Sequence, residues 1–234
     1  MFPRRSPEQP RLRDRWKHGP TPVLGLIGGI GGGKSAVAAR LAARGAAVID
    51  ADAVGHELLE EPGIRDRVVA RFGPGVLEVA AAGKPAEGSI SRRALGGLVF
   101  RDAAALRDLE AILHPAMRER FLRTIERLAD DGDRPCIVLD AAVLLEAGWD
   151  DLCDRIACVD APRAVRLERV LASRGWSDEA LAARERAQWP VEQKRRRADW
   201  IIDNEAGPAH LDREVDRLLG RLAAEAPPDL REIA

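Results

Sequence analysis

The segment Gly28-Gly-Ile-Gly-Gly-Gly-Lys-Ser35 fits the pattern G-x-x-x-x-G-K-[ST] and lies between a predicted strand and a predicted helix. Glycines let successive amide groups turn towards a phosphate, and the N-terminus of the following helix adds partial positive charge. Lys34 can reach the β- and γ-phosphates of a nucleotide, and the Ser35 hydroxyl can ligate Mg²⁺. The sequence therefore predicts a phosphate-binding loop for ATP. The residues that we assign to nucleotide binding in this loop are Gly29, Ile30, Gly31, Gly32, Gly33, Lys34, Ser35 and Ala36.

A second pattern overlaps this loop. Gly31, Gly33 and Ala36 match the looser dinucleotide fingerprint G-x-G-x-x-A, and Asp50 and Asp52 follow near the distance at which such sites bind ribose. This pattern is short, leaves the lysine-serine pair unexplained and does not predict the arginine-rich segment later in the chain. We therefore favour the phosphate-binding loop.

Three aspartates follow apolar runs and are candidates for the chemistry itself. A carboxylate at Asp50 or Asp52 could orient or deprotonate an attacking hydroxyl, and either could instead cap the next helix. We favour Asp52 as the base, because Asp50 would still be finishing a strand and could serve the outer shell of a metal. Asp140 ends another apolar run, the usual position of a Walker-B-type acid that holds Mg²⁺, with a turn residue as the alternative.

Phosphoryl transfer also needs positive charge around the migrating group and exclusion of water. Residues 163–197 hold ten Arg and Lys against five acids, and could supply both as a mobile lid, although any single one could be a solvated surface charge. The basic residues of this segment that we single out are Arg166, Arg169, Arg174, Arg184 and Lys194.

These side chains need a framework of strands and helices. A helical stretch at 35–44 joins two of the apolar runs within few residues, which implies a parallel βαβ unit. Open parallel sheets place ligands at the carboxyl ends of their strands. We predict an α/β protein with the three-layer fold of P-loop NTPases, in domain 23–234. The predicted strands are 23–27, 46–50, 136–140, 155–160 and 200–203.

The stretch 53–134 is too long for a simple crossover and predicts a helical subdomain over the ligand edge of the sheet. Its helices are expected at 91–100 and 102–129, where Leu106, Leu109, Ile112, Leu113 and Met117 share one side. In the lid, helices are expected to start near Ser177 and near Pro190. The four histidines form no metal or triad pattern; His114, followed by a proline in mid-helix, marks either a kink or a substrate contact.

The chain of 234 residues has 37 basic and 38 acidic side chains, which argues against a dedicated nucleic-acid binder. No apolar run is long enough to span a membrane. Residues 1–22 hold six basic side chains, two acids and five prolines, and we expect a solvated, disordered tail rather than a nucleic-acid-binding arm. Three cysteines without a CxxC pair argue against disulfides and zinc, and we expect a cytoplasmic protein. We favour a monomer, although the sequence leaves the oligomeric state open.

With these residues assembled, the chain resembles the dephospho-coenzyme A kinase family from about residue 23 to residue 219. A P-loop alone is shared by many ATPases and kinases, and the ordered set of motifs is far more specific. The motifs that carry the resemblance are GGIGGGKS at 28–35, VIDAD at 48–52, GSISRRAL at 88–95, VF at 99–100, LHP at 113–115, LLE at 144–146 and ADWIIDN at 198–204.

The resemblance implies a P-loop kinase that transfers the γ-phosphate of ATP to the ribose 3′-hydroxyl of dephospho-CoA, the last step of coenzyme A synthesis. It implies Asp52 as the base on that hydroxyl, in agreement with the preference reached above. Dephospho-CoA and ATP with Mg²⁺ are then the expected partners. By position, the resemblance further implies that Arg92, His114 and Glu146 line the acceptor side. Arg169 matches a lid arginine and is expected to be catalytic together with Lys34 and Asp52. Arg174 and Asn204 are expected to bind ATP, with Asn204 near the nucleotide base.

The chain departs from the family pattern at several positions. Ile27 and Ala36 stand where many members have threonine, and Ala142 replaces a proline. The spacing from Arg169 to Arg174 is one residue longer than in many members, which puts the contact of Arg174 with the phosphates in doubt. Two alternatives stay open. The first is a kinase for another small alcohol or nucleoside. The second is a nucleotide switch or motor, and the lack of an Asn-Lys-x-Asp signature in the chain argues against it.

Overall fold

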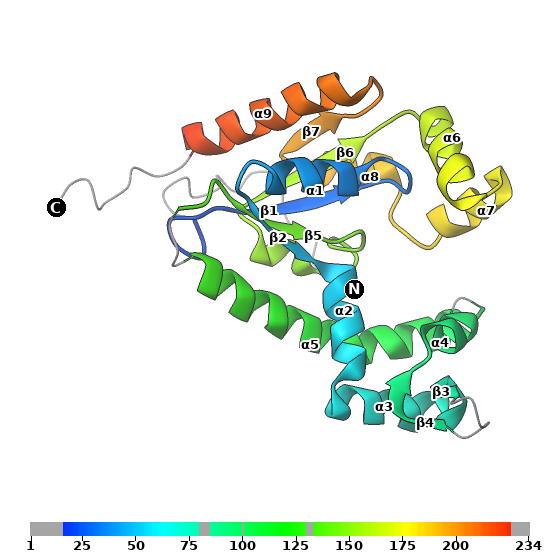
Figure 1. Cartoon of the computed structure of the whole chain (residues 1–234). Helices are drawn as coiled ribbons and strands as arrows, with labels where there is room; N and C mark the ends of the chain where they lie inside the picture. The colour runs from blue at the N-terminus through cyan, green and yellow to red at the C-terminus, as the bar shows by residue number, and fades with distance from the viewer. Residues whose placement is uncertain (1–15, 80–84, 100, 130–132, 226–234) are drawn as a thin grey trace.

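In the computed structural model, residues 16–79, 85–99, 101–129 and 133–225 are described. Their centre is a five-stranded parallel sheet with the strand order β2-β5-β1-β6-β7. Every predicted strand is confirmed, and the three-layer α/β architecture is confirmed with them (Figure 1). The strands are β1 (Val23–Gly28), β2 (Ala47–Asp50), β5 (Ile137–Asp140), β6 (Arg155–Asp160) and β7 (Trp200–Asp203).

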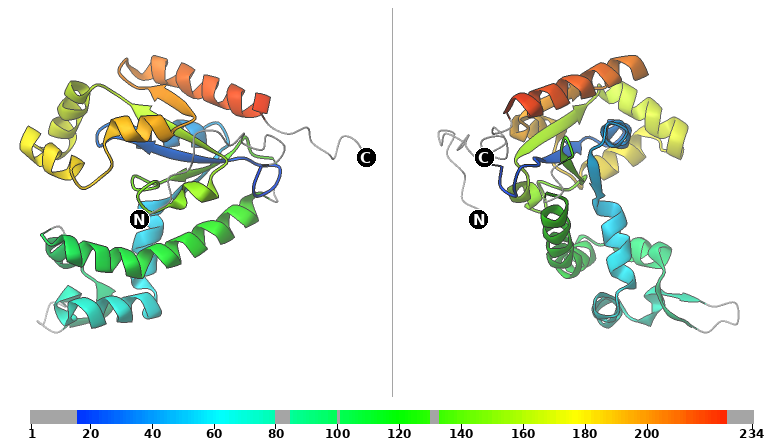
Figure 2. Two further views of the ribbon diagram at one scale, coloured as in Figure 1. Left: turned by 180° about the vertical axis from the view of Figure 1, so that it is seen from behind. Right: turned by 60° about the vertical axis from the view of Figure 1, so that its left-hand side comes forward.

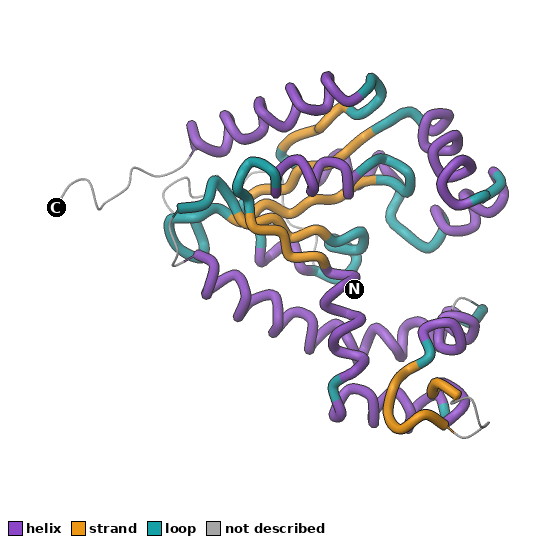
Figure 3. The backbone as a smooth tube through the Cα atoms, viewed as in Figure 1, coloured by secondary structure: helices purple, strands orange, loops and turns teal. Residues whose placement is uncertain are grey.

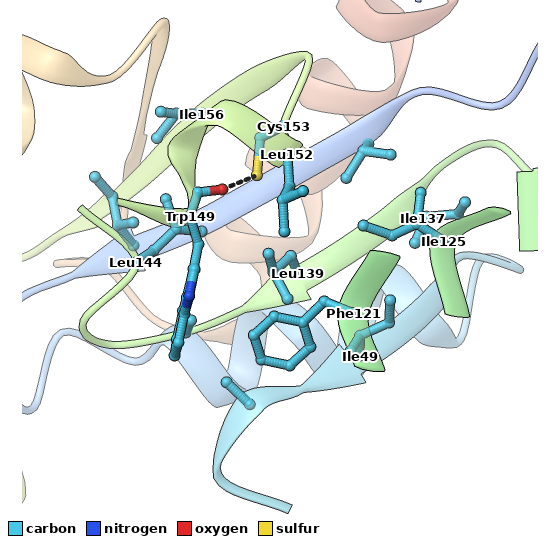
Figure 4. Close-up of a cluster of buried hydrophobic side chains, with 14 of the residues drawn as sticks. Ile49, Phe121, Ile125, Ile137, Leu139, Leu144, Trp149, Leu152, Cys153 and Ile156 are labelled. Carbon is cyan, nitrogen blue, oxygen red and sulfur yellow. Dashed lines mark hydrogen bonds between the residues drawn. The ribbon is translucent and has the colours of Figure 1, made fainter. Parts of the chain in front are cut away.

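Alternating side chains of β1 enter the two apolar layers of the molecule. Leu24 and Leu26 pack against α1 (Lys34–Ala42) and α9 (Pro208–Glu225) on one face. Val23 and Ile27 enter the cluster on the other face, where α2 (Ala51–Glu60) and α5 (Ala103–Ala129) lie. Figure 4 shows this second cluster, in which Phe121 meets Trp149 edge-on, with ring centroids 5.0 Å apart. Burial on both faces explains why these strands read as continuous apolar runs.

The segment between β2 and β5 forms a lobe with its own apolar core, as Figure 2 shows from two sides. Its helices include the two expected from the sequence, and the shared apolar side of α5 is buried or half-buried. The lobe also contains an antiparallel hairpin that the sequence did not predict, visible as two short strands in Figure 3. The remaining elements of the lobe are α3 (Pro62–Phe72), η1 (Pro74–Val76), β3 (Leu77–Val79), β4 (Pro85–Ile90) and α4 (Arg92–Val99).

The predicted lid separates into two parts in the structure. Helices α6 (Arg163–Arg174) and α7 (Asp178–Glu185) project from the sheet (Figure 1), and the Ser177 hydroxyl caps α7 by accepting from the N–H of Ala180, 3.3 Å away. Helix α8 (Val191–Arg197) packs instead against β1 and β6. The lid assigned to 163–197 is therefore too long at its C-terminal end, because α8 belongs to the layered core.

The predicted tail at 1–22 also ends too late. Residues 1–15 lie outside the described part of the chain, whereas Trp16 is buried, at 6% exposure. The Lys17 N–H donates to Asp154 Oδ1 at 2.7 Å, and the Val23 N–H donates to Asp154 Oδ2 at 2.7 Å. The Arg155 guanidinium lies over the Trp16 ring, 5.2 Å from its centroid. Residues 16–22 are thus bound to the sheet at the amino ends of β1 and β6.

Candidate functional site

The glycine-rich loop joins β1 to α1, as its sequence pattern predicts. Gly31 and Gly33 have φ values of 76° and 91°, a backbone conformation that residues with a Cβ rarely adopt. A Cβ on Gly33 would lie 2.0 Å from Asn204 Nδ2. That amide donates to the carbonyl of Gly32 at 2.8 Å. The glycines therefore allow the tight turn of the loop and leave room for the side chain of Asn204, which follows β7 and binds the loop through Gly32.

Lys34 and Asp140 meet directly at the carboxyl ends of β1 and β5. Lys34 Nζ donates to Asp140 Oδ1 in a half-buried ion pair. The parallel register brings Leu26 of β1 and Asp50 of β2 opposite Asp140. Burial raises the pKa of Asp140 above its usual range; the Lys34 ammonium opposes this shift, and the charges of Asp50 and Asp52 add to it. Three carboxylates and the P-loop lysine thus share one edge of the sheet.

Asp50 and Asp52 have different environments at the start of α2. Asp50 Oδ1 accepts from the N–H groups of Asp52 and Ala53, at 2.9 and 3.1 Å, so its side chain is the N-cap of α2. Asp52 lies exposed in the first turn of the same helix. The geometry therefore assigns the cap of α2 to Asp50 and leaves the Asp52 carboxylate free of that role, and the role of Asp52 as the base stays a prediction.

Two arginines of α6 contact the P-loop. Arg169 Nη2 donates to the Asn204 carbonyl at 2.7 Å, and its Nη1 donates to the Gly32 carbonyl at 3.4 Å. Arg166 is buried, donates to the Ile30 carbonyl at 3.2 Å and pairs with Glu185 of α7. Helix α6 therefore supplies two guanidinium groups beside the loop.

Arg174 lies at the C-terminal end of α6. Its guanidinium stacks on Trp176, 4.8 Å from the ring centroid, and Arg184 stacks on the same ring at 3.9 Å. Five residues beyond Arg169, it occupies a different side of α6. The structure therefore does not bring Arg174 to the P-loop, although the sequence placed it with the ATP-binding residues.

The predicted acceptor residues come from three elements. Arg92 of α4 is exposed, and its Nη1 lies 3.3 Å from His56 Nδ1 of α2. His114 of α5 packs edge-on against Trp149, with ring centroids 4.9 Å apart, and burial lowers its pKa although Glu110 opposes the shift. Glu146 lies in the loop after β5, where its Oε1 accepts from the N–H of Trp189 at 2.8 Å.

Sequence reasoning gave Arg166 and Lys194 no role of their own. Both belong to the basic segment, yet both are buried, Lys194 at 1% exposure. Charge alone did not distinguish them from their solvated neighbours. The proline before α8 signalled where that helix starts, but not which side of it is covered.

Among the residues that the structure describes, no group of three or more His, Cys, Asp or Glu side chains is arranged so that it could hold a metal ion. No helix in this part of the chain combines the length and the apolar character that a membrane span requires.

Comparison with known proteins adds a second line of evidence. Residues 22–210 match the family model described as dephospho-CoA kinase (CoaE). A dephospho-CoA kinase of Symbiobacterium thermophilum is 44% identical over 184 residues, which cover 78% of this chain and 73% of that protein. One of Anaeromyxobacter dehalogenans is 40% identical over 215 residues, covering 88% and 98%.

Solved structures agree with the sequence comparison. The crystal structure of TT1252 from Thermus thermophilus superposes with a TM-score of 0.71 at 35% identity, covering 88% of this chain and 97% of that one. A dephospho-CoA kinase from Campylobacter jejuni gives a TM-score of 0.64 at 25% identity, covering 86% and 97%.

Proposed function

The chain belongs to the dephospho-CoA kinase family, and from this premise we propose that it transfers the γ-phosphate of ATP to the ribose 3′-hydroxyl of dephospho-CoA. The products are ADP and CoA. The observation that carries the assignment of roles is the meeting of Lys34 with Asp140 at the sheet edge where Asp52 also lies.

In the proposed mechanism, Asp52 accepts the proton of the 3′-hydroxyl. The hydroxyl oxygen forms a bond to the γ-phosphorus, while the bond from that phosphorus to the bridging oxygen of ADP breaks. The P-loop amides and Lys34 hold the β- and γ-phosphates through the transfer. Asp52 is exposed and can return its proton to solvent after CoA leaves.

The oxygen-rich edge of the sheet suits Mg²⁺. Ser35 and Asp140 would hold the ion together with the nucleotide phosphates, in keeping with the preference of Mg²⁺ for one or two protein oxygens plus phosphate and water. The raised pKa of Asp140 fits this role, because a divalent cation would stabilise the ionised carboxylate that burial, and to a smaller extent Asp50 and Asp52, disfavours. When bound, Mg²⁺ supplies charge neutralisation for the phosphates.

The lid and the acceptor residues complete the site. Arg169 stabilises the negative charge of the migrating phosphoryl group, with Arg166 beside it. Arg174 would have to leave Trp176 to reach the phosphates. Asn204 contacts the nucleotide near its base. Closure of the lid excludes water, so that ATP is not merely hydrolysed.

On the acceptor side, Arg92, His114 and Glu146 bind dephospho-CoA. The lowered pKa of His114 keeps its imidazole neutral at pH 7, so that it acts as a hydrogen-bonding group rather than as a charge. Arg92 supplies positive charge to the pyrophosphate of the acceptor.

We place the enzyme in the cytoplasm and favour a monomer. Its three cysteines are free thiols and buried, which suits a reducing compartment. Analytical ultracentrifugation of the purified protein, with and without ATP, measures the oligomeric state.

The decisive experiment uses the purified chain with ATP, Mg²⁺ and dephospho-CoA. Wild type should form ADP and CoA in equal amounts. Asp52→Asn should lose turnover by about 100-fold or more, since a general base usually contributes at least that much, and should keep its affinity for ATP. Asp50→Asn serves as the matched control and should lose less turnover, because its amide oxygen can still cap α2.

Formation of ADP with another alcohol or nucleoside, but not with dephospho-CoA, would overturn the substrate assignment. An Asp52→Asn variant that retains wild-type turnover would overturn the role of Asp52 while leaving the reaction itself in place.

A further inference from the structure

Lys194 is a buried lysine on α8, the helix that follows α7 in the chain. It is 1% exposed and lies on α8, which packs against β1 and β6. Its ammonium donates to the carbonyl of Ala142 at 2.8 Å and to Gln188 Oε1 at 3.3 Å, and it lies 3.1 Å from Glu146 Oε1. A charge with so little access to water persists in a fold only where its partners are well placed. Burial of Lys194 costs stability, and we therefore asked which function its contacts could serve.

The two carboxylate oxygens of Glu146, the partner of Lys194, differ in their hydrogen bonds. Glu146 Oε1 receives both the Lys194 ammonium and the Trp189 N–H. Glu146 Oε2 is buried and has no hydrogen-bond partner among the residues that the structure describes. A buried carboxylate oxygen that accepts no hydrogen bond is unfavourable. In a ligand site, an N–H or O–H group of the ligand can donate the missing hydrogen bond.

The contacts of Lys194 also join two loops of the site. Ala142 follows Asp140 by two residues, and Glu146 follows in the same loop after β5. Gln188 and Trp189 belong to the connection between α7 and α8. One ammonium thus links the loop that follows Asp140 to the connection between α7 and α8.

We infer that Lys194 is a positioning residue, which holds Glu146 Oε1 so that Oε2 faces a hydroxyl or amino group of the acceptor. The inference rests on the proposed function, because it takes Glu146 as an acceptor-binding residue. Lys194 touches no substrate in this arrangement and acts only through Glu146. Its loss should therefore weaken acceptor binding and leave ATP binding nearly unchanged.

The test combines Lys194→Met, Glu146→Gln and the double variant in steady-state assays with each substrate varied. Lys194→Met should raise KM for dephospho-CoA by about tenfold, the effect of one charged hydrogen bond, with KM for ATP within about twofold of wild type. Glu146→Gln should raise KM for dephospho-CoA at least as much. The double variant should be no worse than Glu146→Gln alone, because the two side chains act as one unit.

The control is Arg213→Met, which removes a positive charge from the exposed surface of α9 and should change neither KM. Additive effects in the double variant, or equal rises in both KM values, would show a general structural role and overturn the inference. If wild type fails to phosphorylate dephospho-CoA, the proposed function fails; if wild type is active and Lys194→Met keeps its KM for dephospho-CoA, only the inference fails.

Thermal unfolding of each variant checks that it folds, since Lys194→Met leaves Glu146 without its cation. If Lys194→Met does not fold, a second pair of variants decides. Trp189→Pro removes the N–H that binds Glu146 Oε1, and Trp189→Ala keeps it. A higher KM for dephospho-CoA in the proline variant than in the alanine variant supports the positioning of Glu146 through Oε1, and equal values contradict it.

Discussion

At the scale of single residues, the site concentrates charge where the fold can least solvate it. Asp140 is buried beside Asp50 and Asp52, and its pKa is raised even though Lys34 pairs with it. Active sites commonly accept such a cost in stability because the same charge is needed for function. The carboxylate that is expected to bind Mg²⁺ is thus also the one whose burial costs stability.

This environment predicts how stability depends on pH. The folded pKa of Asp140 lies above its ordinary value of 3.8, so below pH 3.8 the carboxyl is neutral and its burial costs little. As the pH rises through the raised pKa, folding must bury a charge and stability is lost. Asp140→Asn avoids this loss and should raise Tm at pH 7, with the gain fading below pH 4.

Differential scanning calorimetry across that pH range measures the effect. The same variant should lose most of its turnover, because an amide holds a cation poorly. A Tm gain that is independent of pH would show that relief of charge burial is not its cause.

At the scale of elements, the P-loop depends on an amide from a distant strand end. Asn204 follows β7, yet its side chain bonds to Gly32 and fills the space against Gly33. The loop can hold its amides open for phosphate only while Gly33 keeps its positive φ and lacks a Cβ.

Gly33→Ala should therefore abolish measurable ATP binding and lower the free energy of unfolding by about 1–3 kcal/mol, the cost of one strained backbone position. Isothermal titration with ATP and urea unfolding measure the two effects. The control is Gly220→Ala, because Gly220 is exposed in α9 with open space around it. That variant should gain about 0.5–1 kcal/mol and bind ATP normally. Normal ATP binding by Gly33→Ala would contradict the role given to this loop geometry.

At the scale of the whole molecule, the two ends of the sheet have separate tasks. The carboxyl ends hold the P-loop, Asp140 and Asp52. The amino ends are bound by residues 16–22, where Lys17 Nζ donates to the carbonyls of Asp151 and Cys153 at 2.8 and 2.6 Å. Arg155 extends this contact to α9 through Glu225, 2.7 Å away. The contacts of residues 16–22 and the candidate active site therefore lie at opposite ends of the same strands.

This separation predicts that Trp16→Ala lowers the free energy of unfolding by about 3 kcal/mol, the usual loss for a buried aromatic ring. KM for both substrates should stay within about twofold of wild type at 20 °C. Urea unfolding and initial-rate assays on the same preparations measure both quantities. A large change in KM at unchanged stability would show that the two ends are coupled.

Much of this molecule can be predicted from local sequence patterns. The apolar runs became the five strands, and eight consecutive residues specify the P-loop, because strand burial and loop glycines depend on near neighbours in the chain. Capping of the next helix was an alternative for both Asp50 and Asp52, because a cap bonds to the next two or three residues, and the structure assigns it to Asp50. The dephospho-CoA kinase family was likewise identified from the order of its motifs and confirmed by comparison.

Only the tertiary structure decided which charges are buried and which residues they meet. The strand order places β5 between β2 and β1, which brings Asp140 to Lys34 across 106 positions of sequence. The burial of Lys194 and Arg166, the stacking of Arg174 on Trp176 and the anchoring of Trp16 depend in the same way on which faces pack together. A charged residue looks alike in sequence whether it faces water or a buried carboxylate, because its environment is created by segments that are distant in the chain.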